Sequence, residues 1–182
     1  MENVEELLRL PSPAPKPQSI AFDGTALWMG SRETRRLYAI EPNAWTVREE
    51  AQAPGTPWGM VAVGDEFRVV TGEAPDDDRF IRRFVPGHGF KDADRIACPD
   101  DTGSQLSYDG DRLYLSQWYR KRILALDDAG TVGRIVQLDR EIVGHVVVGG
   151  RFYVATTDDE STPPLRNAPT GTSAKAISRL AV

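Results

Sequence analysis

The chain of 182 residues is long enough for one domain with its own core, since 40% of its residues are hydrophobic and 27% are charged. The net charge of −5 and the lack of a Lys/Arg stripe argue against a nucleic-acid partner, and no apolar run approaches the roughly 20 residues of a membrane helix. The acidic residues 1–6 are unlike a signal peptide, and the single cysteine, Cys98, forbids an internal disulfide. These features predict a soluble cytoplasmic protein without a membrane partner.

One pattern occurs four times along the chain: an apolar run, a glycine, and a large apolar residue three positions after the glycine. The four copies are residues 20–29, 60–69, 106–115 and 145–154. In two copies the glycine follows aspartate, a pair that supplies the positive φ of a tight hairpin turn. Each copy therefore predicts two antiparallel strands joined by a hairpin.

Further strands follow each hairpin and complete a larger unit. Third strands are predicted over residues 37–40, 80–85 and 123–126, and fourth strands over 45–48 and 133–138. The apolar positions alternate or run in fours and do not recur at the helical period of about 3.6. Four antiparallel strands in about 40 to 46 residues are typical of one propeller blade, which predicts an all-β fold.

Two segments carry a family resemblance. Phe22-Asp23-Gly24 leads to Leu27-Trp28, and Tyr108-Asp109-Gly110 leads to Leu113-Tyr114; residues 36–42 and 122–127 then continue in similar ways. These segments resemble blades of the large β-propeller group, which includes NHL-type, SMP-30/gluconolactonase-like, streptogramin-lyase-like and glutamine-cyclotransferase-like proteins. The resemblance covers residues 4–160 and implies blades arranged radially around a channel.

The count of blades predicts an incomplete ring. Three units are whole, and the fourth has only its first two strands, which gives about three and a half blades within residues 1–160. Residues 5–10 align with a fourth strand and are predicted to be the N-terminal closing strand; a short helix capped near Asn3 is the alternative. Because the end blades would expose unpaired edges and apolar faces, we expect self-association.

The tail, residues 161–182, departs from the repeat. It has no aromatic or acidic residue, and Pro163, Pro164, Pro169 and Gly171 would interrupt a strand. We therefore predict an irregular or disordered tail without the third strand expected near residue 162. Truncation or a shifted reading frame would account for this tail, and so would a natural disordered segment.

Propeller geometry predicts where ligands would gather. In each blade the first strand begins and the second strand ends on the same face, at the mouth of the channel. A small-molecule ligand is expected there, and its predicted contacts are Trp58, Gln105, Trp118 and Tyr119.

Three carboxylates occupy the same place in their repeats, six residues after the large apolar residue: Glu33, Glu73 and Asp158. Carboxylate oxygens suit Ca²⁺ or Mg²⁺, so these residues are predicted metal ligands; solvated loop ends would show the same pattern. The resemblance implies a metal held by Glu, Asn and Asp in gluconolactonase-like propellers, or Mg²⁺ with His and Glu in streptogramin-lyase-like ones. No asparagine falls among the matched positions here.

His145 replaces the apolar residue found at its position in the other three repeats. An imidazole that titrates near neutral pH could act as a general acid or base, so His145 and Glu73 are the predicted catalytic residues. A histidine packed within its strand is the alternative.

Three functions remain open from the sequence. The first is small-molecule binding at the channel mouth. The second is an enzyme: a metal-assisted hydrolase, lactonase or lyase, or a glutamine-cyclotransferase-like acyl transferase. The third is a protein-interaction scaffold or a remnant of a longer gene. Fold alone does not separate these functions.

Overall fold

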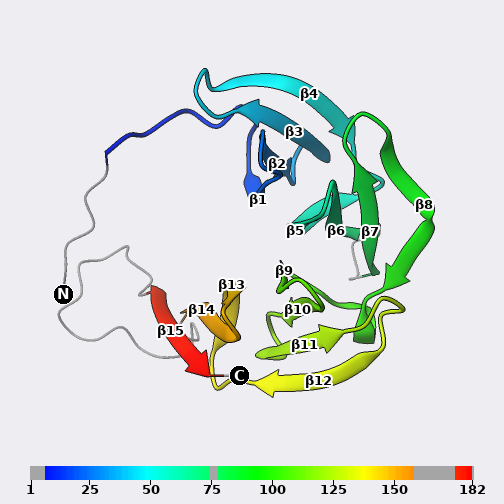
Figure 1. Cartoon of the computed structure of the whole chain (residues 1–182), viewed down its shortest axis with the longest axis vertical. Helices are drawn as coiled ribbons and strands as arrows, with labels where there is room; N and C mark the ends of the chain where they lie inside the picture. The colour runs from blue at the N-terminus through cyan, green and yellow to red at the C-terminus, as the bar shows by residue number, and fades with distance from the viewer. Residues whose placement is uncertain (1–6, 74–77, 158–174, 182) are drawn as a thin grey trace.

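The computed structural model describes residues 7–73 and 78–157 in full and residues 175–181 as backbone. These residues form four antiparallel sheets arranged in an arc around a common centre (Figure 1). The first strand of each sheet lies nearest the centre, and in the three sheets that have four strands the fourth lies at the rim. The all-β, propeller-type fold predicted from the repeats is confirmed.

The sheets follow the chain order, and each is one blade. Blade 1 contains β1 (Pro17–Phe22), β2 (Leu27–Ser31), β3 (Arg36–Glu41) and β4 (Thr46–Gln52). Blade 2 contains β5 (Thr56–Val63), β6 (Glu66–Gly72), β7 (Arg79–Val85) and β8 (Gly89–Ala97). Blade 3 contains β9 (Leu106–Tyr108), β10 (Leu113–Gln117), β11 (Arg122–Leu126) and β12 (Val132–Gln137), preceded by the short 3₁₀ turn η1 (Pro99–Asp101). Blade 4 contains β13 (Glu141–Val148), β14 (Arg151–Thr157) and β15 (Lys175–Ala181).

Strand register confirms the repeat alignment residue by residue. The first aligned residue of each repeat pairs with the residue nine positions later in the adjacent strand. The four pairs are Ile20 with Met29, Met60 with Val69, Leu106 with Leu115, and His145 with Val154. Equivalent positions in different blades can therefore be compared directly.

The hairpin aspartates explain why these turns form. In blade 1, Asp23 Oδ1 accepts hydrogen bonds from the backbone N–H groups of Thr25 and Ala26 at 2.7 Å each. Its Oδ2 accepts the indole N–H of Trp28 at 2.7 Å. Gly24 takes a φ of 97°, which only glycine adopts without strain. One carboxylate thus satisfies the turn and also orients the aromatic residue that packs on the next blade.

Hydrophobic contacts between neighbouring blades hold the arc together. Between blades 1 and 2, the ring of Trp28 meets that of Phe84 edge-on, with centroids 4.9 Å apart, and Phe67 completes the cluster. Blades 2 and 3 join through a cluster around Ile81 and Leu115. Each fully buried Phe or Leu side chain contributes about 1.5–3 kcal/mol to the stability of these junctions.

The structure corrects the predicted N-terminal strand. Of residues 5–10, residues 7–10 are described, and they form neither a strand nor a helix. The chain instead lies along blade 1, where the carbonyl oxygen of Pro11 accepts the indole N–H of Trp45 at 2.7 Å. Prolines at positions 11, 13 and 15 have no N–H group to donate to a strand ladder, which explains the irregular path between residue 10 and β1.

The prediction of an irregular tail is wrong for residues 175–181. These residues form β15, which pairs antiparallel with β14 from Thr157 opposite Lys175 to Arg151 opposite Ala181. The third strand of blade 4 therefore exists, but later than the expected position near residue 162. The segment 175–181 contains neither proline nor glycine, so the strand breakers of the tail all precede it. The other residues of the predicted tail, 161–174 and 182, lie outside the described residues.

Candidate ligand site at the channel mouth

The structure brings Trp58 and Gln105 together from adjoining blades. Gly59 follows Trp58 in β5 and lies against the residues that enter β9. A Cβ atom at Gly59 would lie 2.6 Å from the Cα atom of Gln105 and would also collide with the carbonyl oxygen of Ser104. Only glycine permits this approach, so the backbone of β5 next to Trp58 lies directly against the chain at Gln105.

Two arginines lie against the indole of Trp58. The guanidinium carbon of Arg32, just after β2, is 4.4 Å from the ring centroid. The guanidinium carbon of Arg79, the first residue of β7, is 4.1 Å from it. Arg79 is buried and donates a hydrogen bond to the carbonyl oxygen of Gly103, which links blades 2 and 3. Contacts of this kind are worth about 0.5–2 kcal/mol each, more when water is excluded.

The repeat pattern offered one signal for these arginines. Arg32 follows the end of a second strand, a position that the blade alignment directs toward the mouth. Arg79 opens a third strand, and the alignment of first and second strands contains no information on that position. Neither residue was predicted to contact a ligand.

A buried polar residue lies at or next to the end of the second strand in every blade, on this face. The four residues are Ser31, Thr71, Gln117 and Thr156. Gln117 makes the most bonds of the four, since its amide donates to the carbonyl oxygen of Thr102 at 2.9 Å and its amide oxygen accepts from Nε of Arg122 at 2.6 Å. These bonds fix the chain around the mouth in blade 3, whereas Oγ1 of Thr156 in blade 4 has no hydrogen-bond partner among the described residues.

Trp118 and Tyr119 form a stacked pair on the blade 3 side of the mouth. Their ring centroids are 5.2 Å apart and the rings are 4° from parallel. The indole N–H of Trp118 is donated to the carboxylate of Glu141, at the start of β13, at 2.6 Å. Tyr119 is 71% exposed, so its ring can stack against a planar ligand.

Glu73, a predicted metal ligand and catalytic residue, is held by two arginines. It forms an ion pair with Arg82, whose side chain is only 4% exposed, and a second with Nη1 of Arg95 at 3.5 Å. Arg82 also binds a carboxylate oxygen of Asp92 at 2.7 Å. Glu73 therefore neutralises a buried charge inside blade 2.

Glu33 and Asp158 complete the predicted metal set. Glu33 lies 3.3 Å from Nζ of Lys16 in an exposed ion pair. Asp158 lies outside the described residues. Among the residues that the structure describes, no three His, Cys, Asp or Glu side chains gather closely enough to hold a metal ion.

His145 lies between blades 3 and 4. Its Nε2 atom is 3.3 Å from the carbonyl oxygen of Tyr114 in β10, and its ring faces Phe152 in β14. Burial lowers the pKa of His145 to about 4, and the hydrogen bond with Tyr114 offsets this only in part. Burial also raises the pKa of the Cys98 thiol to about 12. Both groups are therefore uncharged at neutral pH.

Comparison with known proteins identifies the architecture. No family model matches the sequence, and no curated protein matches it. Solved structures do match: glutaminyl cyclase from Myxococcus xanthus superposes with a TM-score of 0.58 at 17% identity, over 76% of this chain and 66% of that one. The chain has a β-propeller fold.

Two further structures lead to the same conclusion. Hydrazine synthase from Kuenenia stuttgartiensis matches with a TM-score of 0.63 at 13% identity, over 97% of this chain and 49% of that one. Virginiamycin B lyase from Staphylococcus aureus matches with a TM-score of 0.59 at 15% identity, over 81% of this chain and 50% of that one. The propeller thus spans about half to two thirds of these proteins, and at this identity the likeness shows the fold alone. No helix within the described residues is long and apolar enough to cross a membrane.

Proposed function

We propose that this propeller binds a small molecule with a carboxylate group at the channel mouth. The position of Arg32 over the indole of Trp58 carries the proposal. The guanidinium of Arg32 is exposed, and within the described part of the chain it has no hydrogen-bond or ion-pair partner. Its N–H groups are therefore available to a ligand that reaches the mouth.

The surrounding groups suit an anionic ligand. A guanidinium binds carboxylate through two parallel hydrogen bonds, and the indole beneath it fixes the plane of the group. Arg79, from β7 of blade 2, lies against the same indole and adds to its positive surroundings. The Gln105 amide, from blade 3, can donate or accept a further hydrogen bond.

Binding is favoured over the catalytic alternatives by the state of the candidate catalytic groups. The carboxylate of Glu73 is engaged by Arg82 and Arg95, and that of Glu33 by Lys16. His145 faces a backbone carbonyl between two blades. A hydrolase or cyclotransferase mechanism that relied on these three residues would need at least one of them free to move a proton or hold a metal.

Calorimetry with two isosteric probes, benzoate and neutral benzamide, tests the proposal. We expect benzoate to bind at least about tenfold more tightly than benzamide, and Arg32→Gln to remove this difference. The matched control is Arg36→Gln, which deletes the same charge from an arginine that pairs with Glu50 at 2.8 Å. Equal affinities for the two probes, no benzoate binding at millimolar concentration, or unchanged benzoate binding in Arg32→Gln would each contradict the proposal.

A further inference from the structure

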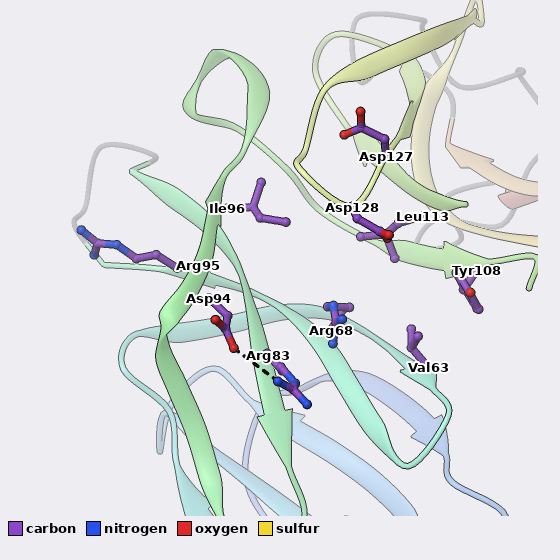
Figure 2. Close-up of a pocket in the computed structure, with 10 residues that line it drawn as sticks. All are labelled: Val63, Arg68, Arg83, Asp94, Arg95, Ile96, Tyr108, Leu113, Asp127 and Asp128. Atoms are coloured by element: carbon purple, nitrogen blue, oxygen red, sulfur yellow. Dashed lines mark hydrogen bonds and ion pairs between the residues drawn. The ribbon is translucent and has the colours of Figure 1, made fainter. Parts of the chain in front are cut away.

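A cleft separates blades 2 and 3 beside the β5–β6 and β9–β10 hairpins, on the face opposite the mouth. Figure 2 shows the residues that line it. Its volume is about 520 Å³, within the range of about 300–1,000 Å³ of small-molecule sites. Apolar side chains from both blades line it in part: Val63, Ile96 and Leu113. Blade 2 contributes three arginines and one carboxylate, Asp94, whereas blade 3 contributes only carboxylates, Asp127 and Asp128.

The blade 2 wall carries a pair of arginines that share one carboxylate. Arg68 in β6 and Arg83 in β7 both donate hydrogen bonds to the carboxylate of Glu66, which holds the two guanidinium groups side by side. Asp94 fixes Arg83 further through a bond of 3.3 Å to Nη1. Within the described part of the chain, Nη2 of both arginines has no partner, so each still has N–H groups to donate.

Glu66 remains charged in this position. Burial alone would raise the pKa of its carboxyl group, but the hydrogen bonds and charges of Arg68 and Arg83 outweigh burial and keep the pKa below its usual value. The two arginines are therefore placed by an ionised partner behind them, which is the arrangement expected of a preorganised anion-binding wall.

The blade 3 wall is anionic. It is formed by Asp127 and Asp128 in the turn between β11 and β12 (Figure 2). Asp127 Oδ1 accepts the backbone N–H groups of Ala129 at 3.0 Å and Thr131 at 2.7 Å, which holds the pKa of this carboxyl below its usual value. Asp128 is exposed and has no partner among the described residues.

Packing between the blades places this turn beside blade 2. Gly130, with a φ of 82°, lies so close to the side chain of Ile96 in β8 that a Cβ atom there would collide with Cγ2 of Ile96. The acidic turn is thus seated against the strand that carries part of the opposite wall. The separation of the two walls is therefore set in part by the contact between Gly130 and the Ile96 side chain.

We propose that this cleft binds a zwitterion of amino-acid or dipeptide size, with its carboxylate at Arg68 and Arg83 and its ammonium group at Asp127 and Asp128. A simple anion would face the aspartates of blade 3, and a simple cation would face the arginines of blade 2. A molecule with both charges at opposite ends satisfies both walls. This site is separate from the mouth and does not depend on the function proposed there.

Calorimetry with alanyl-leucine and two blocked derivatives tests the proposal. N-acetyl-alanyl-leucine lacks the ammonium group, and alanyl-leucine amide lacks the carboxylate. We expect the free dipeptide to bind at least about tenfold more tightly than either derivative. Equal binding of the three peptides, or no binding of the free dipeptide at millimolar concentration, would overturn the proposal.

Charge-matched variants locate the binding. Asp128→Asn should weaken dipeptide binding at least about fivefold, because the ammonium group loses its exposed partner. Asp111→Asn is the control, since it removes the same charge from a side chain that is 86% exposed outside the cleft. The mouth variant Arg32→Gln should retain dipeptide binding. If Arg32→Gln lost dipeptide binding and Asp128→Asn kept it, the dipeptide would bind at the mouth. That result would refute the cleft site and leave the function proposed for the mouth standing.

Discussion

The Nε2 atom of His145 lies 3.3 Å from the carbonyl oxygen of Tyr114, across the junction of blades 3 and 4. A neutral imidazole donates its one N–H group to this oxygen and leaves Nδ1 unprotonated. Nδ1 is buried and has no hydrogen-bond partner among the described residues. A second proton would therefore bind at Nδ1, where no hydrogen-bond acceptor is present, and the imidazolium would be buried without compensation. For this reason burial lowers the pKa of His145 so far.

This pairing predicts a loss of stability in acid. The pKa of His145 falls from 6.5 to about 4 on folding, so the unfolded chain binds the proton first as the pH drops. The contribution of His145 to stability is fully present above the pKa that this residue has in the unfolded chain, and it declines as the pH falls toward 4. We expect the free energy of unfolding in urea to decrease by up to about 2 kcal/mol between about pH 7 and pH 5 through this group.

Two variants isolate the contribution of His145. His145→Leu introduces the residue that blade 3 has at the equivalent position, Leu106, and should remove this part of the pH dependence. His88→Gln changes the other histidine, which lies exposed in the β7–β8 turn, and should leave the dependence in place. Identical pH profiles for the native chain and His145→Leu would show that the junction tolerates the imidazolium.

Gly59→Ala is expected to destabilise the chain where blades 2 and 3 meet. The added methyl group would lie 2.6 Å from Cα of Gln105, and backbone cannot yield as a flexible side chain can. We expect a loss of about 1–3 kcal/mol in unfolding free energy. Gly144 occupies the equivalent position in blade 4 and has open space around it, so Gly144→Ala should be nearly neutral. Equal effects of the two substitutions would contradict the close approach.

The repeat was sufficient to predict the blades because it contains their turns and their register. Asp23-Gly24 and Asp109-Gly110 form the expected hairpins, and strand pairing follows the alignment even at His145. The partners of site residues were not predictable in this way. The approach of Arg79 to Trp58 depends on where β7 begins after a loop without counterpart in the other blades, and His145 binds a backbone oxygen that leaves no side-chain pattern.

A shared offset does not by itself define a metal site, and with Asp158 outside the described residues the metal site stays a prediction. Glu33 and Glu73 occupy equivalent positions, yet each is neutralised by a cation near its own blade: Lys16 in one case and Arg82 in the other. An alignment of strands gives position around the channel. It does not show which neighbouring cations form ion pairs with the carboxylates.

Tyr114 and Tyr153 occupy equivalent positions but differ in their bonds. The hydroxyl of Tyr114 donates to Oδ2 of Asp109 at 2.7 Å, whereas the hairpin of blade 4 has Val148 in place of the aspartate. Tyr114→Phe should cost about 1–2 kcal/mol of unfolding free energy, and Tyr153→Phe less than half as much. Burial first and the Asp109 hydrogen bond second raise the pKa of Tyr114 to about 12, so an absorbance titration should find one tyrosine that ionises late. The late transition should vanish in Tyr114→Phe and persist in Tyr153→Phe.

Glu73→Gln should destabilise the chain far more than Glu33→Gln. Glu73 neutralises the buried guanidinium of Arg82, and breaking a buried ion pair costs about 3–5 kcal/mol. Asp92 still binds Arg82 in the variant, so we expect the lower end of this range. Glu33 forms an exposed pair with Lys16, worth about 0–1 kcal/mol. Urea unfolding measures both losses. A rise in Tm with Ca²⁺ or Mg²⁺ that disappears in Glu73→Gln would favour the metal-site prediction over this structural role.

The end blades expose apolar side chains on their first strands. Ile20 and Phe22 on β1 are 60% and 53% exposed, while Met60, which is equivalent to Ile20, is buried against the preceding blade. On blade 4, Val148 is 58% exposed. We propose that the exposed face of β1 in one copy of the chain packs on the exposed face of blade 4 in a second copy. Each face is one half of the contact that joins successive blades. Sedimentation velocity should therefore show a concentration-dependent shift above the monomer.

Lysine substitutions on the two faces test this self-association. Phe22→Lys and Val148→Lys should each weaken the concentration dependence, since a charge would be buried in the joined faces. Ile135→Lys is the control, because Ile135 is 51% exposed on the rim strand β12, away from both faces. A native chain that sediments as a monomer at every concentration would contradict the proposal. An Ile135→Lys variant that weakens association as much as the other two would show that general solubility, not blade-to-blade contact, controls the effect.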